Sequence, residues 1–466
     1  MMIQALWLYP PLAIARLGPS DTPCPSYFWG PNDVRPRGTG KTTILPAETL
    51  AVAADGSVTS TVPAEVPFKD AAGFRPVCPF FELHGEWTTD DATARGPITE
   101  QVLGMFGLTL RDLTWRVEVA NLKPFHYTLN PSDRIMAAVQ LAGNDTARQV
   151  LRGASPPGSA QPLVPVGQHV PLGQVQLTRP SGPFPELRLR FTPAAGLVYG
   201  PTNLLERSEQ FPLPLDRLFL NPDAPWCGFS LAQDDPRTNP GGLFASDDNG
   251  VSLGLVDDVC DGLVRCDLPG GVSAVARIVV GPPTYAPDRR LFVSLADGLA
   301  DRVKRLEVRA SAYVEDLDAT TLEVRDLMER VLETMELMNV DFQNQRAQGE
   351  NAAIARDAGL PEEAARGRAF AVPELLADRP LPLTEVGRQR HRRFVSLEVF
   401  EDILRERPEL VNLMIREPMT GDRYYDRRMP ALMRGSDRHP MHITRRQYDL
   451  LLAWVQRLRR DVEGGS

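Results

Sequence analysis

Proline is the residue that most limits how this chain can fold. The 466-residue sequence contains 43 prolines, and most of them are spread through its first 300 residues. A proline has a fixed φ and no backbone N–H, so it interrupts helix interiors. The distribution therefore predicts many short strands joined by turns rather than long helices. A looser stretch is expected from Gly153 to Pro185.

Alternating residues indicate several strands in this region. Leu113 to Asn121 and Leu187 to Thr192 both alternate apolar with polar residues, the pattern of a strand with one buried face. Gly262 to Leu268 and Val272 to Val280 flank a Pro-Gly-Gly turn, which indicates a hairpin. Residues 1–297 are therefore predicted to form a mainly β domain, a sandwich or a related assembly of sheets.

The remaining residues, 298–466, are predicted to form a helix-rich second domain. From Asp316 to Val340, apolar residues recur at helical spacing with charged residues opposite, which favours an amphipathic helix. Its apolar face comprises Val324, Leu327, Met328, Val331, Leu332, Met335 and Met338. A polar, partly helical connector is expected over residues 341–380. A further helix is expected from Ser396 to Arg407, stopped by Pro408.

The last helix is expected from Thr444 to Arg460. Thr444 and Gln447 have the spacing of a capping box, in which each side chain accepts a hydrogen bond from the other residue's backbone N–H. Its apolar face comprises Tyr448, Leu451, Leu452, Val455 and Leu458. The arginines of its final turns suit the negative end of the helix dipole.

The composition is close to that of soluble globular proteins. Hydrophobic residues make up 42% and charged residues 24%, and the net charge is -9 with both signs mixed. Neither nucleic acid nor a membrane is expected as a partner, because no apolar run reaches about 18 residues and no large basic region occurs. The N-terminus lacks the basic region of a secretory signal, and five cysteines do not suggest a disulfide scaffold, so a cytoplasmic location is expected. A homo-oligomer is left open.

Residues 38–43 (Gly-Thr-Gly-Lys-Thr-Thr) resemble the end of a phosphate-binding loop. The full motif requires a further glycine where Arg35 stands, with a buried strand before the loop and a helix after it. Pro36 and Pro46 flank the segment instead. An exposed basic loop is therefore the preferred interpretation.

Two cysteines are candidates for a zinc site, because thiolates bind zinc. Cys260 and Cys266 lie near three aspartates, and the two thiols are half of a zinc site or the two ends of a disulfide. No four-ligand set is visible, so the preferred interpretation is that Cys266 packs in a strand beside an acidic turn.

A second group of metal-type residues precedes the last helix. Asp437, His439 and His442 are three weak candidate ligands. Pro440 lies between the histidines and the segment is typical of a loop, so hydrogen-bonded loop histidines are preferred. Two basic clusters, 388–393 and 457–460, lack the interleaved aromatic residues that stack on nucleic-acid bases, which favours solvated surfaces.

Five motifs occur in a fixed order along the chain. They are Pro-Leu-Ala-Ile-Ala-Arg-Leu-Gly at 11–18 with Tyr-Phe-Trp-Gly-Pro at 27–31, Leu-Thr-Trp-Arg-Val-Glu-Val-Ala-Asn-Leu-Lys at 113–123, Asp-Asp-Val-Cys-Asp-Gly at 257–262, Val-Val-Gly-Pro-Pro-Thr-Tyr-Ala-Pro at 279–287, and Met-Pro at 429–430 followed by Ile-Thr-x-x-Gln-Tyr ending at Trp454. In this order they resemble the motifs of the lysine ε-oxidase and glycine oxidase family of cysteine tryptophylquinone enzymes. The resemblance covers nearly the whole chain.

The resemblance implies amino-acid oxidase chemistry that depends on a quinone built from a cysteine and a tryptophan. In the family, both residues follow the last helix described above. Here no cysteine follows Cys266, and Trp454 is the only tryptophan after Trp226. The chain is therefore expected to hold no cofactor of its own, with cysteine tryptophylquinone present only if a partner supplies it, and no catalytic residue is carried over. Adjacent Trp226 and Cys227 are not expected to substitute, because neighbouring side chains rarely reach the geometry of a ring-to-sulfur bond.

Three functions follow, in decreasing order of expectation. The first is a non-catalytic binding, scaffold or accessory protein. The second is the scaffold half of a split amino-acid or amine oxidase, with a protein partner docking on the helix from Thr444 to Arg460. The third is an enzyme with a metal cofactor at Asp437, His439 and His442.

Overall fold

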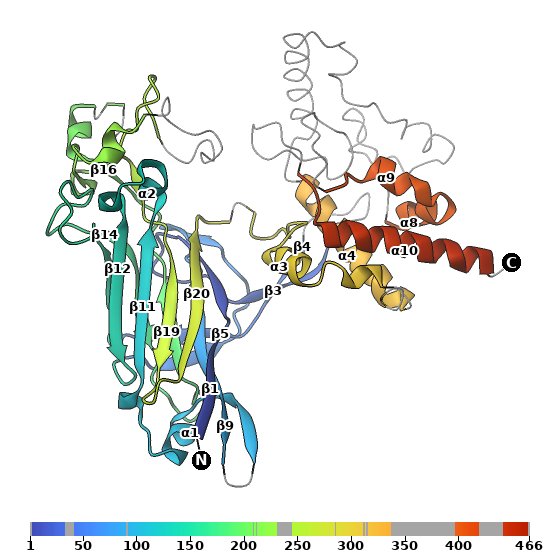
Figure 1. Ribbon diagram of the computed structural model, residues 1–466, viewed down its shortest axis with the longest axis horizontal. Helices are drawn as coiled ribbons and strands as arrows, with labels where there is room; N and C mark the ends of the chain where they lie inside the picture. The colour runs from blue at the N-terminus through green and yellow to red at the C-terminus, as the bar shows by residue number, and fades with distance from the viewer. Residues whose placement is uncertain are drawn as a thin grey trace. The chain divides into compact units, whose positions relative to one another are not determined.

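Figure 1 shows the computed structural model of the protein. The structure describes residues 2–32, 42–89, 92–207, 209–210, 212–230, 245–284, 286–310, 313, 316–336, 397–418 and 441–464. Contacts divide the chain into two compact units: the first comprises Met1–Phe28 and Leu45–Tyr285, and the second comprises Trp29–Ile44 and Ala286–Ser466. The domain boundary after residue 297 stays a prediction, because compact units need not be independently folding domains.

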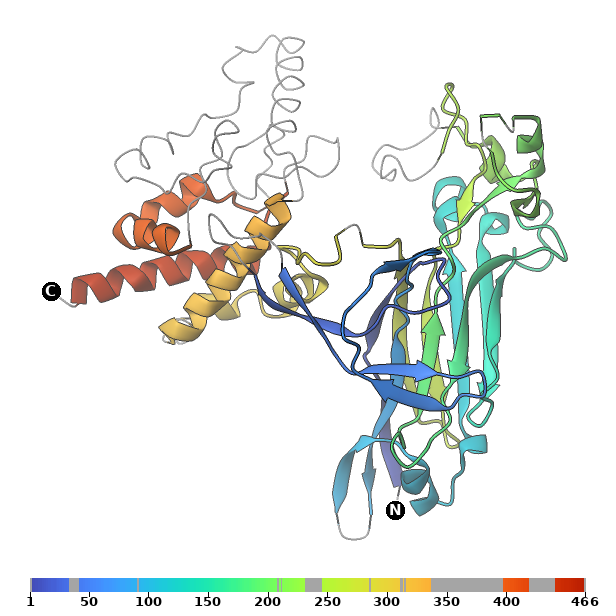
Figure 2. The same cartoon turned by 180° about the vertical axis from the view of Figure 1, so that it is seen from behind.

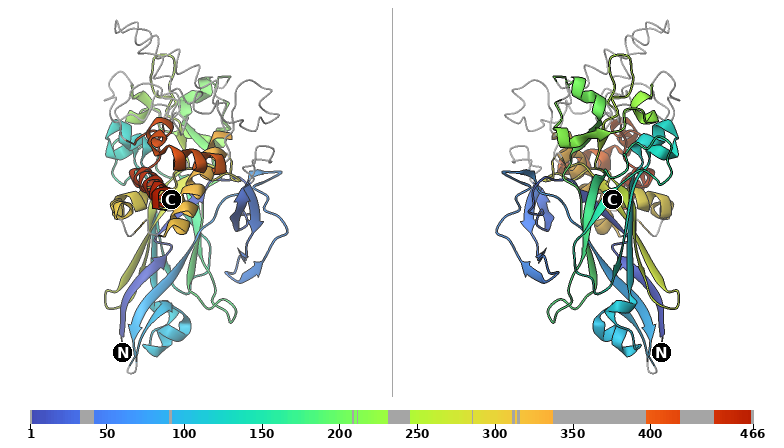
Figure 3. Two further views of the ribbon diagram at one scale, coloured as in Figure 1. Left: turned by 90° about the vertical axis from the view of Figure 1, so that its right-hand side faces the viewer. Right: turned by 90° about the vertical axis from the view of Figure 1, so that its left-hand side faces the viewer.

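The first unit is built on two β-sheets. The first sheet has the order β1 (Met2–Tyr9), β9 (Phe80–Thr88), β15 (Arg188–Thr192), β14 (Val170–Leu177) and β13 (Gln149–Gly153), with β10 (Thr93–Pro97) also paired to β9. The second sheet has the order β12 (Ile135–Ala142), β11 (Thr114–Asn121), β19 (Asp261–Asp267), β20 (Ser273–Gly281) and β2 (Leu12–Arg16). Their strand pairs are antiparallel except for β2 with β20, which is parallel. Figure 3 shows the two sheets from the side.

One hydrophobic core takes side chains from both sheets. Trp115 and Val117 of β11 belong to it together with Phe81 of β9 and Phe191 of β15, and each is at most 1% exposed. Burial of side chains of this size stabilises a fold by about 1.5–3 kcal/mol each. The alternation of β11 is confirmed, since Arg116 points to solvent between its two buried neighbours. The predicted mainly β, sandwich-like body is confirmed.

Shorter elements complete the first unit. The strands are β5 (Thr49–Val52) with β6 (Val58–Thr61), β7 (Lys69–Asp70) with β8 (Gly73–Phe74), and β16 (Val198–Pro201) between β17 (Leu218–Leu220) and β18 (Val256–Asp257). The helices are α1 (Glu100–Met105) and α2 (Lys123–Thr128), with 3-10 turns at Leu110–Asp112, Pro131–Asp133, Thr202–Arg207, Leu215–Arg217 and Pro225–Gly228. Figure 2 shows β5 and β6 (blue) crossing in front of the first sheet.

The predicted hairpin is confirmed and the predicted loose stretch is wrong. β19 and β20 pair along their length, and the Leu268 N–H closes the turn by donating to the Val272 carbonyl at 2.9 Å. The stretch from Gly153 to Pro185 instead contains β14, whose Leu172 and Val175 are buried in the core. The polar residues of β14 occupy its outer face, so the period-two pattern is present there but is obscured by a proline and a glycine.

The second unit is helical, with one two-stranded sheet. Its helices are α3 (Leu295–Val303), α4 (Leu317–Glu336), α8 (Leu397–Glu406), α9 (Val411–Met414) and α10 (Arg445–Gly464), with 3-10 turns at Glu307–Arg309 and Pro408–Leu410. β3 (Tyr27–Asn32), which starts in the first unit, pairs with β4 (Thr42–Pro46). Val324, Leu327, Met328 and Val331 of α4 pack in one core with the apolar residues of α10. The helices predicted within 316–340 and 396–407 are therefore confirmed over the described residues.

The capping box of the last helix is confirmed. The Thr444 N–H donates to Gln447 Oε1 at 2.8 Å, and the Gln447 N–H donates back to Thr444 Oγ1 at 3.2 Å. α10 continues to Gly464, four residues beyond the predicted end at Arg460. Tyr448, Leu451, Val455 and Leu458 are all buried, as the apolar spacing predicts.

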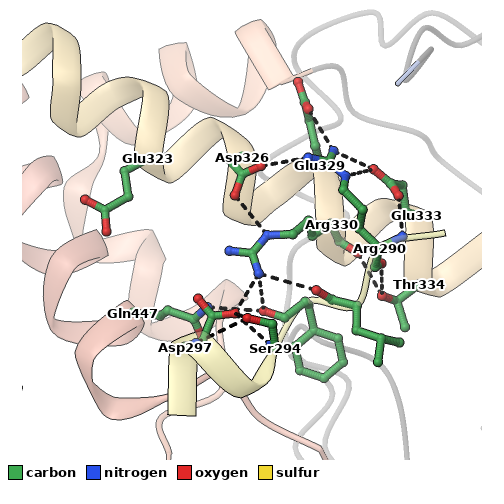
Figure 4. Close-up of polar contacts among 12 residues, drawn as sticks. Arg290, Ser294, Asp297, Glu323, Asp326, Glu329, Arg330, Glu333, Thr334 and Gln447 are labelled. Carbon is green, nitrogen blue, oxygen red and sulfur yellow. Dashed lines mark hydrogen bonds and ion pairs between the residues drawn. The ribbon is translucent and has the colours of Figure 1, made fainter. Parts of the chain in front are cut away.

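A group of ion pairs joins the start of the second unit to α4 (Figure 4). The Arg290 backbone N–H and Nε donate to Glu333 at 2.8 Å each, and Nη1 donates to Asp326 at 2.8 Å. Nη2 donates to Glu329 at 3.2 Å. The Glu333 side chain is 0% exposed, and the Arg290 guanidinium is a cationic partner for its buried charge.

Several sequence predictions fall on residues outside the described ranges. These are the connector at 341–380, the basic cluster at 388–393, and residues 38–41 of the glycine-rich segment. Thr42 and Thr43 begin β4, so a strand follows that segment where a phosphate-binding loop requires a helix. Among the described residues, no helix has both the length and the apolar character needed to cross a membrane.

Candidate functional site

Two of the sequence motifs meet at one end of the second sheet. β11 pairs antiparallel with β19, so that Ala120 lies opposite Asp261. The end of the motif at 113–123 therefore adjoins the motif at 257–262. The Asn121 side chain, 2% exposed as a residue, donates from Nδ2 to the Asp257 carbonyl at 2.8 Å and to Asp257 Oδ1 at 3.2 Å. Asn121 Oδ1 accepts from the Lys123 N–H at 3.1 Å. The asparagine thus fixes the start of α2 against β18.

A small cleft opens beside this contact. Its volume is about 190 Å³, and its lining includes Lys123, Val198, Trp226, Leu255 and Asp257. The Lys123 ammonium and the Asp257 carboxylate form an ion pair, and both side chains are about one-third exposed (35% and 34%). Exposure of this degree leaves the pair screened by water, so its contribution to stability is small. The cleft presents one cation, one anion and one aromatic wall.

Asp258 is a buried carboxyl next to the cleft residue Asp257. Its Oδ2 accepts hydrogen bonds from the Gly196 N–H at 3.0 Å and the Leu197 N–H at 2.8 Å. Its Oδ1 is buried with no hydrogen-bond partner among the described residues. Burial raises the pKa of Asp258 to about 6, although the two backbone N–H groups act in the opposite direction. Its hydrogen bonds anchor the segment that leads into β16.

The acidic cluster does not form a metal site in the described part of the chain. Burial raises the pKa of Asp261, and the nearby Lys123 charge opposes that rise. Cys260 is buried with its thiol donating to the Leu172 carbonyl at 3.4 Å, and Cys266 is buried within β19. Both thiols are free, and the described residues contain no group of three or more side chains placed to bind a metal. The preferred interpretation of a strand cysteine is confirmed.

Of the second group of candidate metal ligands, the structure describes only His442. Asp437 and His439 lie outside the described residues. His442 is exposed, and its Nδ1 lies 3.0 Å from the Ile443 carbonyl oxygen. The three residues therefore stay a prediction.

Two cysteine–tryptophan pairs among the described residues lie in positions that do not suit a substrate-accessible tryptophylquinone. Trp115 and Cys266 are partners across β11 and β19, but they are 1% and 0% exposed and lie in the core. Trp226 donates from Nε1 to the Leu255 carbonyl at 3.2 Å, while the adjacent Cys227 thiol donates to the Asn221 carbonyl at 3.2 Å. Each group is therefore held by a separate backbone carbonyl. All five cysteines precede residue 267, so none accompanies Trp454 in the second unit.

The other motif residues also make internal contacts. β2 runs parallel to β20, and the Leu17 N–H donates to the Gly281 carbonyl at 2.9 Å, which joins the first motif to the fourth. In the second unit, Gln447 Nε2 donates to the Phe292 carbonyl at 3.2 Å and the Trp454 indole N–H donates to Thr321 at 2.9 Å. Four motifs therefore converge on one sheet, and the fifth organises the helical core. Spacing alone does not reveal these contacts.

Comparisons with known proteins give partial structural similarity. Searches against family models and against curated proteins find no match. A solved structure of the ε-lysine oxidase from Marinomonas mediterranea is 16% identical, with 70% of this chain and 44% of that chain covered and a TM-score of 0.38. The Schiff base intermediate of the L-Lys ε-oxidase from the same organism, with L-Lys, is 18% identical, with 64% and 39% covered and a TM-score of 0.33. The chain spans about two-fifths of the length of these similar chains.

Proposed function

We propose that this chain is a cytoplasmic, non-catalytic binding or scaffold member of the cysteine tryptophylquinone oxidase family. The observation that carries the proposal is the role of the motif residues. Asn121, Gln447 and Trp454 direct their polar groups to partners within the chain. Side chains engaged in this way hold a fold together and are not free to act on a substrate. The family motifs are thus explained as requirements of the architecture.

The cysteine and tryptophan side chains support the same proposal. The quinone supplies the electrophile for oxidation of an amine, and the protein around it supplies binding and orientation. The described pairs, Trp115 with Cys266 and Trp226 with Cys227, do not fit such a group, so no catalytic step is assigned to this chain. What these residues do is rigidify the sheets and their connections.

An activity assay on the purified full chain tests the proposal. The chain is incubated with the twenty standard amino acids and with simple amines, and hydrogen peroxide is measured, with an active amino-acid oxidase as the positive control. Redox-cycling staining of the denatured chain then tests for a covalent quinone. We expect neither peroxide nor staining. Peroxide release that depends on an amino acid would overturn the non-catalytic assignment.

The second candidate is the scaffold half of a split oxidase, with the quinone on a protein partner. The observation that favours it is the completeness of α10, whose capping box is formed and whose last turns carry exposed Arg459 and Arg460. The apolar face of α10 is buried in its own unit, so a partner would dock on the charged side. Affinity capture of the full chain, followed by quinone staining of the co-purified proteins, separates this candidate from the first. A quinone-positive partner with oxidase activity would establish the split enzyme.

A further inference from the structure

A second and larger cavity lies in the first unit, on the outer face of the first sheet. Its volume is about 520 Å³. Period-two alternation places Gln176 of β14 and Arg190 of β15 in its lining, whereas the adjoining Leu177 and Leu189 are buried in the core. β5 supplies another part of the lining, and Figure 3 shows the β5–β6 hairpin (blue) beside the sandwich. A polar sheet face that normally contacts water is here partly covered.

Three arginines line this cavity, and their partners differ. Arg75 Nε pairs with Asp70 Oδ2 at 3.2 Å, and the Ser20 hydroxyl holds that carboxylate by donating to it at 2.5 Å. Arg148 Nε donates only to a neutral group, Gln176 Oε1, at 3.3 Å. Within the described residues, neither Arg148 nor Arg190 forms an ion pair with a carboxylate.

Arg190 is the least satisfied of the three. Its Nε is buried and has no hydrogen-bond partner among the described residues. Its guanidinium carbon lies 6.0 Å from the centre of the Phe80 ring, at the limit of a cation–π contact. Burial raises the pKa of the Cys78 thiol, and Arg190 opposes that rise through its charge and through a hydrogen bond to this neutral partner. Arg190 is partly buried, and a buried N–H donor without an acceptor is unfavourable, so an oxyanion in the cavity that accepts from it would relieve that cost.

The cavity wall around these cations is rigid before any ligand binds. Gln176 Nε2 donates to the carbonyls of Ala53, Ala54 and Thr146 at 3.0, 3.1 and 3.1 Å, which orients its Oε1 toward Arg148. Six prolines, with few conformations available to them, form apolar parts of the lining. Among the described residues, Asp21 is the only acidic one in the lining, and it is exposed. Preorganised walls reduce the entropy lost on binding.

We propose that this arginine cavity binds a small organic acid whose carboxylate or phosphate group pairs with Arg148 and Arg190. The volume lies within the range of small-molecule sites, about 300–1,000 Å³, and exceeds what one inorganic anion fills. The prolines contact the carbon body of the ligand, and the arginines bind its oxyanion group through paired N–H donors. The inference does not depend on the family assignment.

Isothermal titration calorimetry on the full chain at constant ionic strength tests the proposal. The probes are succinate, citrate and phenylacetate as carboxylates, glycerol phosphate and inorganic phosphate as phosphates, and succinamide as the neutral match to succinate. We expect saturable binding of at least one organic anion and none of succinamide. The carboxylate and phosphate arms identify which oxyanion the site prefers. Absence of saturable binding by every anion would overturn the proposal.

Substitutions assign the binding to the cavity. Arg190→Gln and Arg148→Gln should each weaken the affinity at least tenfold, and Arg190→Lys should weaken it less than Arg190→Gln because the charge remains. Arg116→Gln is the matched control, since it removes one exposed positive charge from the other sheet. If the Arg190 variants do not fold, the affinity of Arg148→Gln alone shows whether the anion binds in the cavity. Equal affinity in the control and the cavity variants would place the anion elsewhere and refute the site.

Discussion

Arg290 and Arg190 are the same residue type in opposite environments. Arg290 reaches three carboxylates of α4, and one of them, Glu333, is fully buried (Figure 4). Arg190 lies in a cavity with an aromatic ring and a thiol nearby, and its Nε has no described acceptor. The comparison separates two roles that a partly buried arginine can have. Such an arginine stabilises a unit where carboxylates surround it, and it is available to a ligand where they do not.

The largest effect is expected from Arg290→Gln. The substitution removes the guanidinium, whose Nε and Nη2 donate to the buried Glu333 carboxylate, and leaves the backbone N–H that also donates to it. Since breaking a buried ion pair leaves a charge poorly compensated, we expect the free energy of unfolding of the second unit to fall by about 3–5 kcal/mol. Urea unfolding followed by circular dichroism measures it.

Arg407→Gln is the control for that prediction, because Arg407 pairs with Glu409 and both side chains are more than half exposed (51% and 60%). It should change the free energy of unfolding by less than about 1 kcal/mol. Equal effects of the two substitutions would mean that burial of Glu333 does not set the strength of the Arg290 network.

Asp258 is an intermediate case, because one oxygen has two donors and the other has none. Its pKa rises from 3.8 to about 6 in the folded protein, so the native state holds this proton more tightly than the unfolded chain. Stability attributable to Asp258 is therefore lost as pH rises from about 4 to about 6, by about 3 kcal/mol in total. Asp258→Asn should remove this loss.

The free energy of unfolding, measured by urea between pH 4 and 7, checks the Asp258 prediction. As pH rises from about 4 to about 6, the free energy of unfolding of the variant should increase relative to that of the natural protein. Above about pH 6 the difference between the two proteins should stay constant. Near pH 4 the two proteins should be similar, which serves as an internal control. A constant difference at all pH values would show that the carboxyl does not titrate in that range.

Sequence reasoning succeeded where one short segment decides the structure. The alternation of Leu113 to Asn121 depends on nearest neighbours, and the Thr444–Gln447 capping box lies within a single turn. Such signals need no knowledge of the rest of the chain. β14 was missed because Pro171 and Gly173 interrupt its pattern, although the buried core residues around them dictate a strand.

The sites were not predictable in the same way. The contact of Asn121 with Asp257 joins residues 136 positions apart, and the spacing of either motif says nothing of it. The arginine cavity gathers Arg75, Arg148 and Arg190 from three separate segments. Basic residues scattered along a sequence have no period or spacing that indicates a common cavity. Strand pairing places Arg190 opposite Gln176, the residue that Arg148 contacts, and neither segment indicates this by itself.

A smaller effect is expected from Asn121→Ala at the meeting point of the motifs. The change removes two donated hydrogen bonds to Asp257 and one accepted from the Lys123 N–H. Since Asn121 is buried, we expect a loss of about 2–3 kcal/mol in the free energy of unfolding of the first unit. Gln140→Ala, which removes an exposed amide that contacts Arg116, is the control and should cost less than about 1 kcal/mol.

The smallest effect on stability is expected from Arg190→Gln, and this prediction bears most directly on the comparison with Arg290. No described carboxylate loses its partner, and the change lowers the repulsion among the three cavity arginines. We therefore expect the free energy of unfolding to change by less than about 1 kcal/mol, in either direction, as measured by urea without added organic anion. Adding an anion that binds the cavity should stabilise the natural protein and leave the variant unaffected, because only the native state with its arginines intact holds the ligand. A loss of several kcal/mol without anion would give Arg190 the structural role of Arg290 and remove the distinction between them.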